Sequence, residues 1–262
     1  MNKLFGYPGG KWPIRKTIVS LFPEHTTYVD VFGGSASILI YKPPSAGEVF
    51  NDKNEDLANF FRVVKHRPAE LTEKAKFWIH SRIFWQDKKE SPPLKDEVAR
   101  AFRFWVLLAD SYGGIGGTFG TARESVRSVT HAREYLGEIS DRLRSAHIEC
   151  LDFRDCIRKY DGRETFFYCD PPYRGTKGGD KNYDQLTDRD WRDLKDILAG
   201  INGKFLLSSS ENKFVMSLFE GFIIERIAAP VSLSNRGRSH RIELVIANYK
   251  LPKGKNGEGK KK

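Results

Sequence analysis

The fold of this chain is most constrained by short apolar segments that alternate with segments of helical pattern. Two helices are expected at residues 55–64 and 188–201, and the second carries Trp191, Leu194 and Leu198 on one face. The expected strands are residues 28–32, 48–51, 148–151, 165–169, 204–208, 222–227 and 242–249. Strands separated by helices predict an α/β fold whose mostly parallel sheet is covered on both faces.

Residues 65–146 have a different pattern, with few strand signals and many charged and aromatic side chains. Within them Val98, Phe102, Trp105 and Ala109 recur at helical spacing and predict a helix over 93–110. The glycine-rich run SYGGIGGTFG at 111–120 predicts an irregular loop or a hairpin. We therefore expect a mainly helical insertion, residues 65–146, in a domain formed by residues 1–64 and 147–252.

Charge and composition narrow the class of protein. The formal net charge is +10, of which +4 lies in residues 253–262, a low-complexity segment predicted to be a disordered basic tail. A basic body favours an anionic partner, nucleic acid first, although many basic proteins bind none. No apolar stretch has the length of a membrane span, so no membrane association is expected.

The cysteines and histidines argue for a reducing compartment and against a metal site. Cys150, Cys156 and Cys169 form no close pair, and the start MNKLFGYPGGK has no apolar leader. We expect free thiols and a cytoplasmic protein. The histidines are scattered, and the HxE at His147 and Glu149 is not followed by PCxxC, so neither a metal nor a zinc deaminase is expected.

Two glycine turns are candidate ligand sites. Asp30-Val-Phe-Gly-Gly-Ser-Ala-Ser37 ends a strand and begins a helix without a full GxGxxG, which disfavours a dinucleotide site and leaves an ordinary turn equally open. Asp52, after the next strand, could accept hydrogen bonds from ribose hydroxyls or could be a helix N-cap. Tyr7-Pro-Gly-Gly-Lys11 is not a Walker loop; it is either a plain turn or a turn that presents Lys11 to a carboxylate and Tyr7 for stacking.

The segment FFYCDPPY, residues 166–173, has the strongest chemical meaning. An apolar strand ends in Asp170, and the two prolines that follow hold it stiffly. A fixed carboxylate and the Pro171 carbonyl could accept both N–H bonds of an exocyclic amino group and stabilise the positive charge that grows as its nitrogen attacks. Tyr173 could stack on a base flipped out of a duplex. The alternative is a strand-ending turn.

A cytosine C5 methylase would need a nucleophilic cysteine, usually after a proline. The three cysteines of this chain instead follow Glu149, Asp155 and Tyr168. That pattern argues against the C5 class and favours direct transfer to an amino group, which depends on placement more than on covalent chemistry.

The ordered set YPGGK, DVFGGSAS, NDKNEDL, LDF and FFYCDPPY, with the closing segment 231–249, resembles the Dam-type (alpha-group) S-adenosylmethionine-dependent DNA adenine-N6 methyltransferases. The motifs extend from Phe5 to Tyr249. The resemblance implies a Rossmann-like methyltransferase sheet with an inserted, mainly helical target-recognition domain. Many members have tryptophan and alanine where this chain has Tyr7 and Pro8.

The resemblance also implies roles for matched residues. Residues near the cofactor S-adenosylmethionine would be Tyr7 and Lys11 at its methionine end, Asp30, Phe32, Gly33, Gly34 and Ser35 in the main pocket, Asp52 at the ribose, Asp152 and Phe153 at its adenine, and Asp170. Asp170, Pro171, Pro172 and Tyr173 would act on the target adenine. For Asp152 a helix cap, and for Phe153 a core position, are the alternatives.

DNA contacts are expected in the insertion and before the last strand, where arginine can pair with guanine or phosphate and an aromatic side chain can fill the space of a flipped base. The candidates are Tyr112, Thr118, Phe119, Thr121, Arg123, Arg127, Asn235, Arg236, Arg238 and Arg241.

We therefore expect methyl transfer to the N6 amino group of adenine in a specific short double-stranded DNA sequence, by base flipping, with no metal and no covalent intermediate. The enzyme is expected to be a monomer, and pairing with a restriction nuclease stays open. Two alternatives remain: amino methylation of another base, cytosine N4 in DNA or adenine in RNA, and a catalytically silent DNA-binding relative.

Overall fold

A computed structural model describes residues 3–120, 129–173, 186–230 and 240–252 of the chain. Its centre is one seven-stranded sheet in the order β3-β2-β1-β4-β5-β7-β6. The strands are β1 Thr27–Asp30, β2 Gly47–Asn51, β3 Ala146–Glu149, β4 Thr165–Cys169, β5 Lys204–Ser210, β6 Ile223–Pro230 and β7 His240–Ala247. Strands β1 to β5 pair in parallel, and β7 runs antiparallel to both β5 and β6. The expected α/β fold with a mostly parallel sheet is confirmed.

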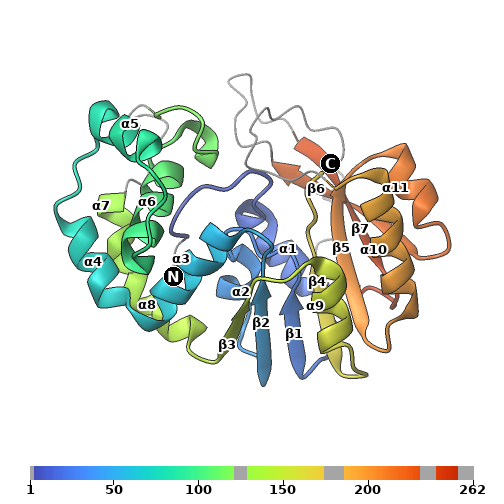
Figure 1. Cartoon of the computed structure of the whole chain (residues 1–262). Coiled ribbons are helices and arrows are strands. Elements are labelled where there is room, and N and C mark those ends of the chain that lie inside the picture. Colours follow the sequence, from blue (N-terminus) through green and yellow to red (C-terminus); the bar gives the residue numbers. More distant parts are fainter. Residues whose placement is uncertain (1–2, 121–128, 174–185, 231–239, 253–262) are drawn as a thin grey trace, which may run out of the picture.

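Helices cover both faces of the sheet, as Figure 1 shows. They are α1 Arg15–Ser20, α2 Ser37–Tyr41, α3 Glu55–His66, α4 Pro68–Lys76, α5 Arg82–Glu90, α6 Glu97–Ala109, α7 Val129–Ala132, α8 Leu136–Leu143, α9 Phe153–Tyr160, α10 Asp188–Gly200 and α11 Lys213–Leu218. Successive strand residues point to opposite faces, so Phe166 joins the core under α2 and α3, whereas Phe167 joins the core under α9 and α10. Trp191, Leu194 and Leu198 are buried in this second core, as the helical spacing predicted.

Local hydrogen bonds explain where the helices begin. Asn54 caps α3 by accepting from the backbone N–H groups of Asp56 and Leu57, and Thr187 forms a capping box with Asp190 at the start of α10. Helix α6 begins at Glu97 and not at Pro93, because Asp96 accepts from the backbone N–H of Ala99. The expected helix was therefore correct in kind and several residues too long at its start.

The third strand was expected at 148–151 and lies at Ala146–Glu149. Its register pairs Ala146 with Glu48. The backbone N–H of Leu151 donates to the side chain of Asn51 at 2.9 Å instead of to a neighbouring strand, so the ladder ends before it.

The helical segment between β2 and β3 gathers at one side of the molecule (Figure 1). It shares its core with the sheet, because Phe60 of α3 and Trp105 of α6 belong to the same apolar cluster as Tyr28 of β1. The indole of Trp105 also donates to the backbone oxygen of Leu4 at 3.1 Å. The division of the chain into a catalytic domain and an inserted domain stays a prediction.

All three cysteines are free thiols, with Cys150 exposed and the other two buried. Of the helices in the described ranges, none combines the length and the apolar character needed to cross a membrane.

Candidate active site

The site lies where the order of the strands reverses. From β1 the chain builds β2 and β3 to one side, and then β4 and β5 to the other. Strands β1 and β4 are parallel neighbours, with Asp30 paired in register with Tyr168. Parallel sheets bind ligands beyond the carboxyl ends of the strands at this kind of switch point. Asp30, which ends β1, and Asp170, which follows β4, therefore reach the same edge of the sheet.

A cavity of about 900 Å³ opens at this edge. Every residue predicted to bind the cofactor or to act on the target amino group lines it: Tyr7, Lys11, Asp30, Phe32, Gly33, Gly34, Ser35, Asp52, Asp152, Phe153, Asp170, Pro171, Pro172 and Tyr173. Ile115 of the glycine-rich run 111–120 lines it too. The fold thus brings together five motifs that are far apart in the sequence.

The glycine turn after β1 is held tightly. The N–H of Gly33 donates to Asn51 O at 2.7 Å, and a Cβ added at Gly33 would lie 2.2 Å from the ring of Phe50. Gly34 has a φ of +50° and lies against the ring of Tyr7. Since glycine adopts positive φ without strain and leaves room for neighbours, both positions need it.

Asp52 is fixed by two backbone donors, the N–H of Gly34 at 3.0 Å and the N–H of Asn54 at 2.9 Å. It is not the helix N-cap, because Asn54 fills that position, so the alternative of Asp52 as an N-cap was wrong. Burial raises the pKa of the Asp52 carboxyl, and these two hydrogen bonds partly counteract the rise. A carboxylate has about four lone-pair positions, so Asp52 can still accept bonds from a ligand.

The pentapeptide Tyr7 to Lys11 is a turn, closed by the N–H of Gly10 donating to Tyr7 O at 3.0 Å. It carries Lys11, only 2% exposed, into the site. The Lys11 ammonium donates to Gly9 O at 2.9 Å and to Asp170 Oδ1 at 2.5 Å, and it lies 3.4 Å from Glu243 Oε1. The expectation that Lys11 neutralises a carboxylate is met by the geometry.

Asp170 is anchored through one oxygen. Lys11 and the hydroxyl of Ser208 both donate to Oδ1, the latter at 3.0 Å, and the hydroxyls of Tyr168 and Ser208 lie 3.0 Å apart. Among the described residues, no hydrogen bond to Asp170 ends on Oδ2. Burial raises the pKa of the Asp170 carboxyl, Lys11 lowers it, and Glu243 raises it.

Asp30 and Tyr173 complete the buried group. Burial, followed by the nearby Asp170, raises the pKa of the Asp30 carboxyl well above its ordinary range. Tyr173 donates its hydroxyl to Glu243, and its ring faces the Lys11 ammonium at 4.8 Å from the centroid. Several acids here surround one ammonium, so a cationic ligand group would be electrostatically favoured.

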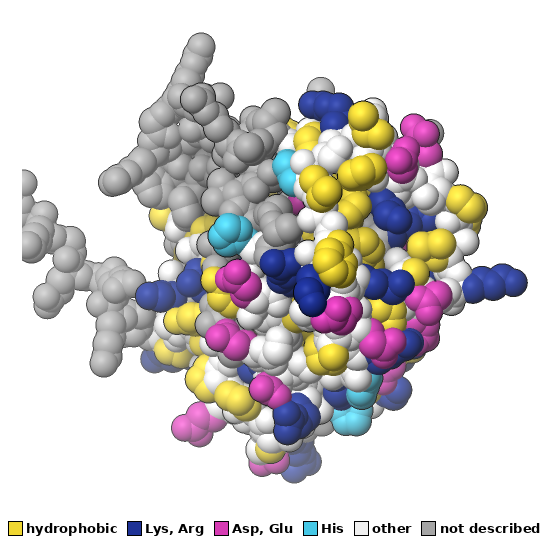
Figure 2. Space-filling view, turned by 90° about the vertical axis from the view of Figure 1, so that its left-hand side faces the viewer, with side chains coloured by type: hydrophobic (Ala, Val, Ile, Leu, Met, Phe, Trp, Pro, Cys, Tyr) yellow, Lys and Arg dark blue, Asp and Glu magenta, His cyan; other side chains and the backbone are white. Residues whose placement is uncertain are grey.

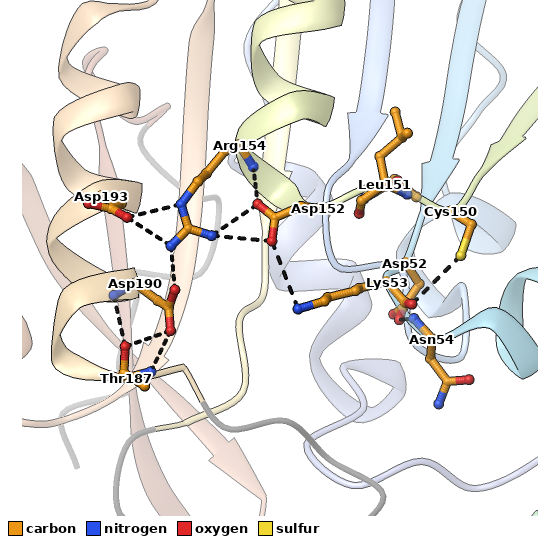
Figure 3. A network of polar contacts seen from close by, with 11 residues as sticks. Asp52, Lys53, Asn54, Cys150, Leu151, Asp152, Arg154, Thr187, Asp190 and Asp193 are labelled. Carbon is orange, nitrogen blue, oxygen red and sulfur yellow. Dashed lines mark hydrogen bonds and ion pairs between the residues drawn. The ribbon is translucent and has the colours of Figure 1, made fainter.

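At the other end of the cavity Asp152 is the N-cap of α9, accepting from the N–H of Arg154 at 3.0 Å, and Phe153 is 4% exposed. Both alternatives, the helix cap and the core position, therefore describe real contacts, and both residues also line the cavity. Figure 3 shows how the Arg154 guanidinium lies between Asp152 and two acids of α10, Asp190 and Asp193.

Sequence reasoning missed several residues of the site. Glu243 and Ser208 contact Asp170 or its partners, Arg154 contacts Asp152, and Asn51 joins two strand ends through Val31 O and Leu151 O. Glu243 is an acid beside the apolar run Leu244–Ala247 of β7, and Asn51 is the polar residue that ends β2, which are the signals that could have marked them. Ser208 and Arg154 have no comparable signal.

The predicted DNA contacts are only partly within the described residues. Tyr112 is 41% exposed and Thr118 is exposed, whereas the ring of Phe119 packs 4.5 Å from that of His80 and faces Trp85. The side chain of Arg241 and the residues Thr121, Arg123, Arg127, Asn235, Arg236 and Arg238 lie outside the described set, as does the tail 253–262. Their roles stay predictions.

The face of the helical segment carries apolar side chains among lysines and arginines, as Figure 2 shows. Its large exposed apolar side chains include Phe77, Ile79, Ile83 and Phe84. Across all the described ranges, no group of three or more His, Cys, Asp or Glu side chains is placed to hold a metal ion.

Comparison with known proteins finds methyltransferases among the similar chains. The chain is 25% identical over 289 residues to the type II methyltransferase M.MjaIII of Methanocaldococcus jannaschii, covering 93% of this chain and 97% of that protein. It is 22% identical over 177 residues to the DNA adenine methylase of Vibrio cholerae, covering 64% of this chain and 63% of that enzyme. It is also 22% identical over 263 residues to the retron Ec67 DNA adenine methylase of Escherichia coli, covering 94% of this chain and 91% of that protein.

The family model of the D12 class N6 adenine-specific DNA methyltransferases matches residues 7–233, which extend from the Tyr7 turn past the motif at Asp170. The match thus includes both ends of the cavity and the helical segment between β2 and β3. The chain belongs to the D12 class of N6 adenine-specific DNA methyltransferases.

Proposed function

We propose that the cavity binds S-adenosylmethionine at its Asp52 and Asp152 end and a flipped target adenine at its Asp170 end, within a short specific sequence of double-stranded DNA. Its volume, about 900 Å³, is at the upper end of the usual range for ligand pockets, about 300–1,000 Å³. A cavity of this size suits two ligands side by side.

The donor and acceptor groups of the cavity fit this cofactor. Asp52 retains acceptor positions for ribose hydroxyls beyond its two backbone donors. Asp152 offers an acceptor to an amino group. Burial raises the pKa of the Asp30 carboxyl, and the ammonium of the methionine end, placed beside it, would favour its ionised form. When bound, S-adenosylmethionine supplies an electrophilic methyl group.

The role of Asp170 follows from the different surroundings of its two carboxylate oxygens. Lys11 and Ser208 hold Oδ1, so Oδ2 can accept one N–H of the target amino group, while the Pro171 carbonyl accepts the other. Both bonds draw the nitrogen lone pair away from the ring. The fixed carboxylate would then stabilise the positive charge that grows on the nitrogen as the N–CH3 bond forms and the S–CH3 bond of the cofactor breaks. Loss of one N–H proton to solvent would restore the neutral amine. Placement supplies much of the remaining rate enhancement.

The helical segment is the proposed target-recognition part. Ile115 lines the cavity, and Tyr112, three residues earlier in the same loop, is exposed. An exposed aromatic ring next to a base pocket can fill the space that a flipped base leaves. Tyr173 would stack on the flipped base.

The anchoring of Asp170 through Oδ1 alone is the observation that carries this proposal. It is tested by methyl transfer from labelled S-adenosylmethionine to unmethylated genomic DNA, with Asp170→Asn and the control Asp196→Asn, which changes an acid that is 70% exposed on α10. Sequencing would then map the modified bases.

We expect N6-methyladenine in one short motif with the control, and a rate at least about a hundredfold lower with Asp170→Asn while cofactor binding persists. Label on cytosine N4, or on RNA but not DNA, would contradict the proposal in favour of another amino-methylation target. Absence of cofactor binding by the unmodified chain would favour a catalytically silent DNA-binding relative.

A further inference from the structure

Arg154 is surrounded by acids to an unusual degree for a residue at the rim of a cavity. Its Nη1 lies 3.0 Å from Asp152 Oδ1 and 3.2 Å from Asp152 Oδ2. Its Nε and Nη2 donate to Asp193 Oδ2 at 3.0 and 2.8 Å, and Nη2 also donates to Asp190 (Figure 3). Burial by itself would lower the pKa of the guanidinium, but these carboxylates outweigh it and raise the pKa.

The acids of α10 fix the position of the guanidinium. Asp190 also accepts from the hydroxyl and the backbone N–H of Thr187, so it is part of the helix cap. Burial would raise the pKa of Asp190, but the bonds from Thr187 and Arg154 lower it to about 2. The guanidinium also lies over the ring of Phe153, 4.3 Å from its centroid. A planar donor held on several sides has little freedom to rotate.

This anchoring determines how Asp152 is presented. Its Oδ1 receives both the backbone N–H and the Nη1 of Arg154. Its Oδ2 receives the longer contact from Arg154 Nη1, at 3.2 Å, and Lys53 Nζ lies 4.0 Å from the same oxygen. Since a carboxylate oxygen can accept about two hydrogen bonds, Oδ2 retains room for one donor from the cavity.

We propose that Arg154 is a positioning residue that locks the Asp152 carboxylate as an acceptor for the 6-amino group of the cofactor's purine, and so determines the selectivity for adenine over a 6-oxo purine. The inference rests on the proposed cofactor site. A 6-oxo purine would place an acceptor oxygen against the fixed carboxylate, where the two repel each other and the purine oxygen has no donor.

A pair of product analogues tests this directly. S-adenosylhomocysteine and S-inosylhomocysteine differ at the purine 6-position, and their Kd values can be measured by titration calorimetry. The variants are Arg154→Met and the matched control Arg158→Met, which changes an exposed arginine of the same helix that only approaches Asp155, at 3.6 Å. Asp193→Asn, which loosens one anchor of the guanidinium, serves as a second variant if Arg154→Met does not fold.

The unmodified chain and Arg158→Met should bind the adenosyl compound at least about tenfold more tightly than the inosyl compound. In Arg154→Met this ratio should fall at least about fivefold, mainly through weaker adenosyl binding, and in Asp193→Asn it should fall less. The KM for S-adenosylmethionine should rise, while kcat at saturation changes by less than about twofold.

A purely structural role of Arg154 would lower the melting temperature and weaken both compounds equally, and an unchanged ratio in Arg154→Met would overturn the inference. Equal affinities of the unmodified chain for both compounds would also overturn it while leaving the cofactor site intact. Binding of neither compound by the unmodified chain would instead contradict the proposed cofactor site itself.

Discussion

Lys11 Nζ lies 2.5 Å from Asp170 Oδ1, although the two residues are 159 positions apart in the sequence. The ammonium is 2% exposed and the Asp170 side chain 17%, and Glu243 Oε1 lies 3.4 Å from the same ammonium. The cation therefore compensates the charge of two buried or nearly buried acids at the point where the target amino group is expected. Its removal should affect both stability and methyl transfer.

Lys11→Met should lower the single-turnover rate of methyl transfer by about a hundredfold, because Asp170 loses the donor that orients it. It should also lower the free energy of unfolding by about 3–5 kcal/mol, since acids stay buried without their cation. Rapid-quench kinetics and chemical denaturation measure the two effects. Lys16→Met, which changes an exposed lysine of α1, is the control and should leave both unchanged.

The pH dependence of the reaction should shift in opposite directions in two variants. Burial raises the pKa of the Asp170 carboxyl, Lys11 lowers it, and Glu243 raises it. Since the ionised carboxylate is the acceptor, the single-turnover rate should fall as the pH decreases through this raised pKa. Glu243→Gln should move the acidic limb to lower pH, and Lys11→Met should move it to higher pH. If the acidic limbs of the two variants shifted in the same direction, the Asp170 carboxyl would not be the group that controls this limb.

The hydroxyl and the ring of Tyr173 should have separable effects. Tyr173→Phe removes the bond to the fully buried Glu243 and should lower the free energy of unfolding by about 1–3 kcal/mol, with a less than about tenfold loss of rate. Tyr173→Leu also removes the stacking surface. We expect a large decrease in the rate on intact DNA and a smaller decrease in affinity for DNA with an abasic site opposite the target. Equal rates for the two variants would exclude a stacking role.

Two adjacent glycines should respond differently to the same substitution. Gly113 and Gly114 have φ values of +67° and +73°, so alanine is strained at either, by about 1 kcal/mol. A Cβ at Gly114 would lie 2.4 Å from the backbone of Gly6, whereas one at Gly113 would meet nothing within 4 Å. Gly114→Ala should therefore displace the segment that leads to Tyr7 and raise the KM for the cofactor several-fold. Gly113→Ala should show only the strain, as a small decrease in melting temperature.

Much of the fold and of the site was predictable from local sequence. The alternation of apolar strands with helices determined the parallel sheet, and two glycine turns and DPPY mark chain positions that need unusual backbone geometry. Such patterns act over a few residues, so they can be interpreted without the tertiary structure. The prediction failed for the bounds of β3, Ala146–Glu149, because the side chain of Asn51 takes the N–H of Leu151. It also failed for the N-cap of α3, which is Asn54, two residues after Asp52.

Only the tertiary structure decided which side chains complete the site. Glu243 meets Tyr173 across 70 positions, Ser208 meets Asp170 across 38, and Arg154 meets Asp193 across 39. Those contacts depend on the strand order, in which β5 lies beside β4 and β7 follows on the far side of β5, and on the packing of α9 against α10. Sequence determined which acids end the strands, whereas packing determined which oxygen of each acid is held and which remains open to a ligand, because hydrogen-bond direction depends on neighbours that the local sequence does not contain.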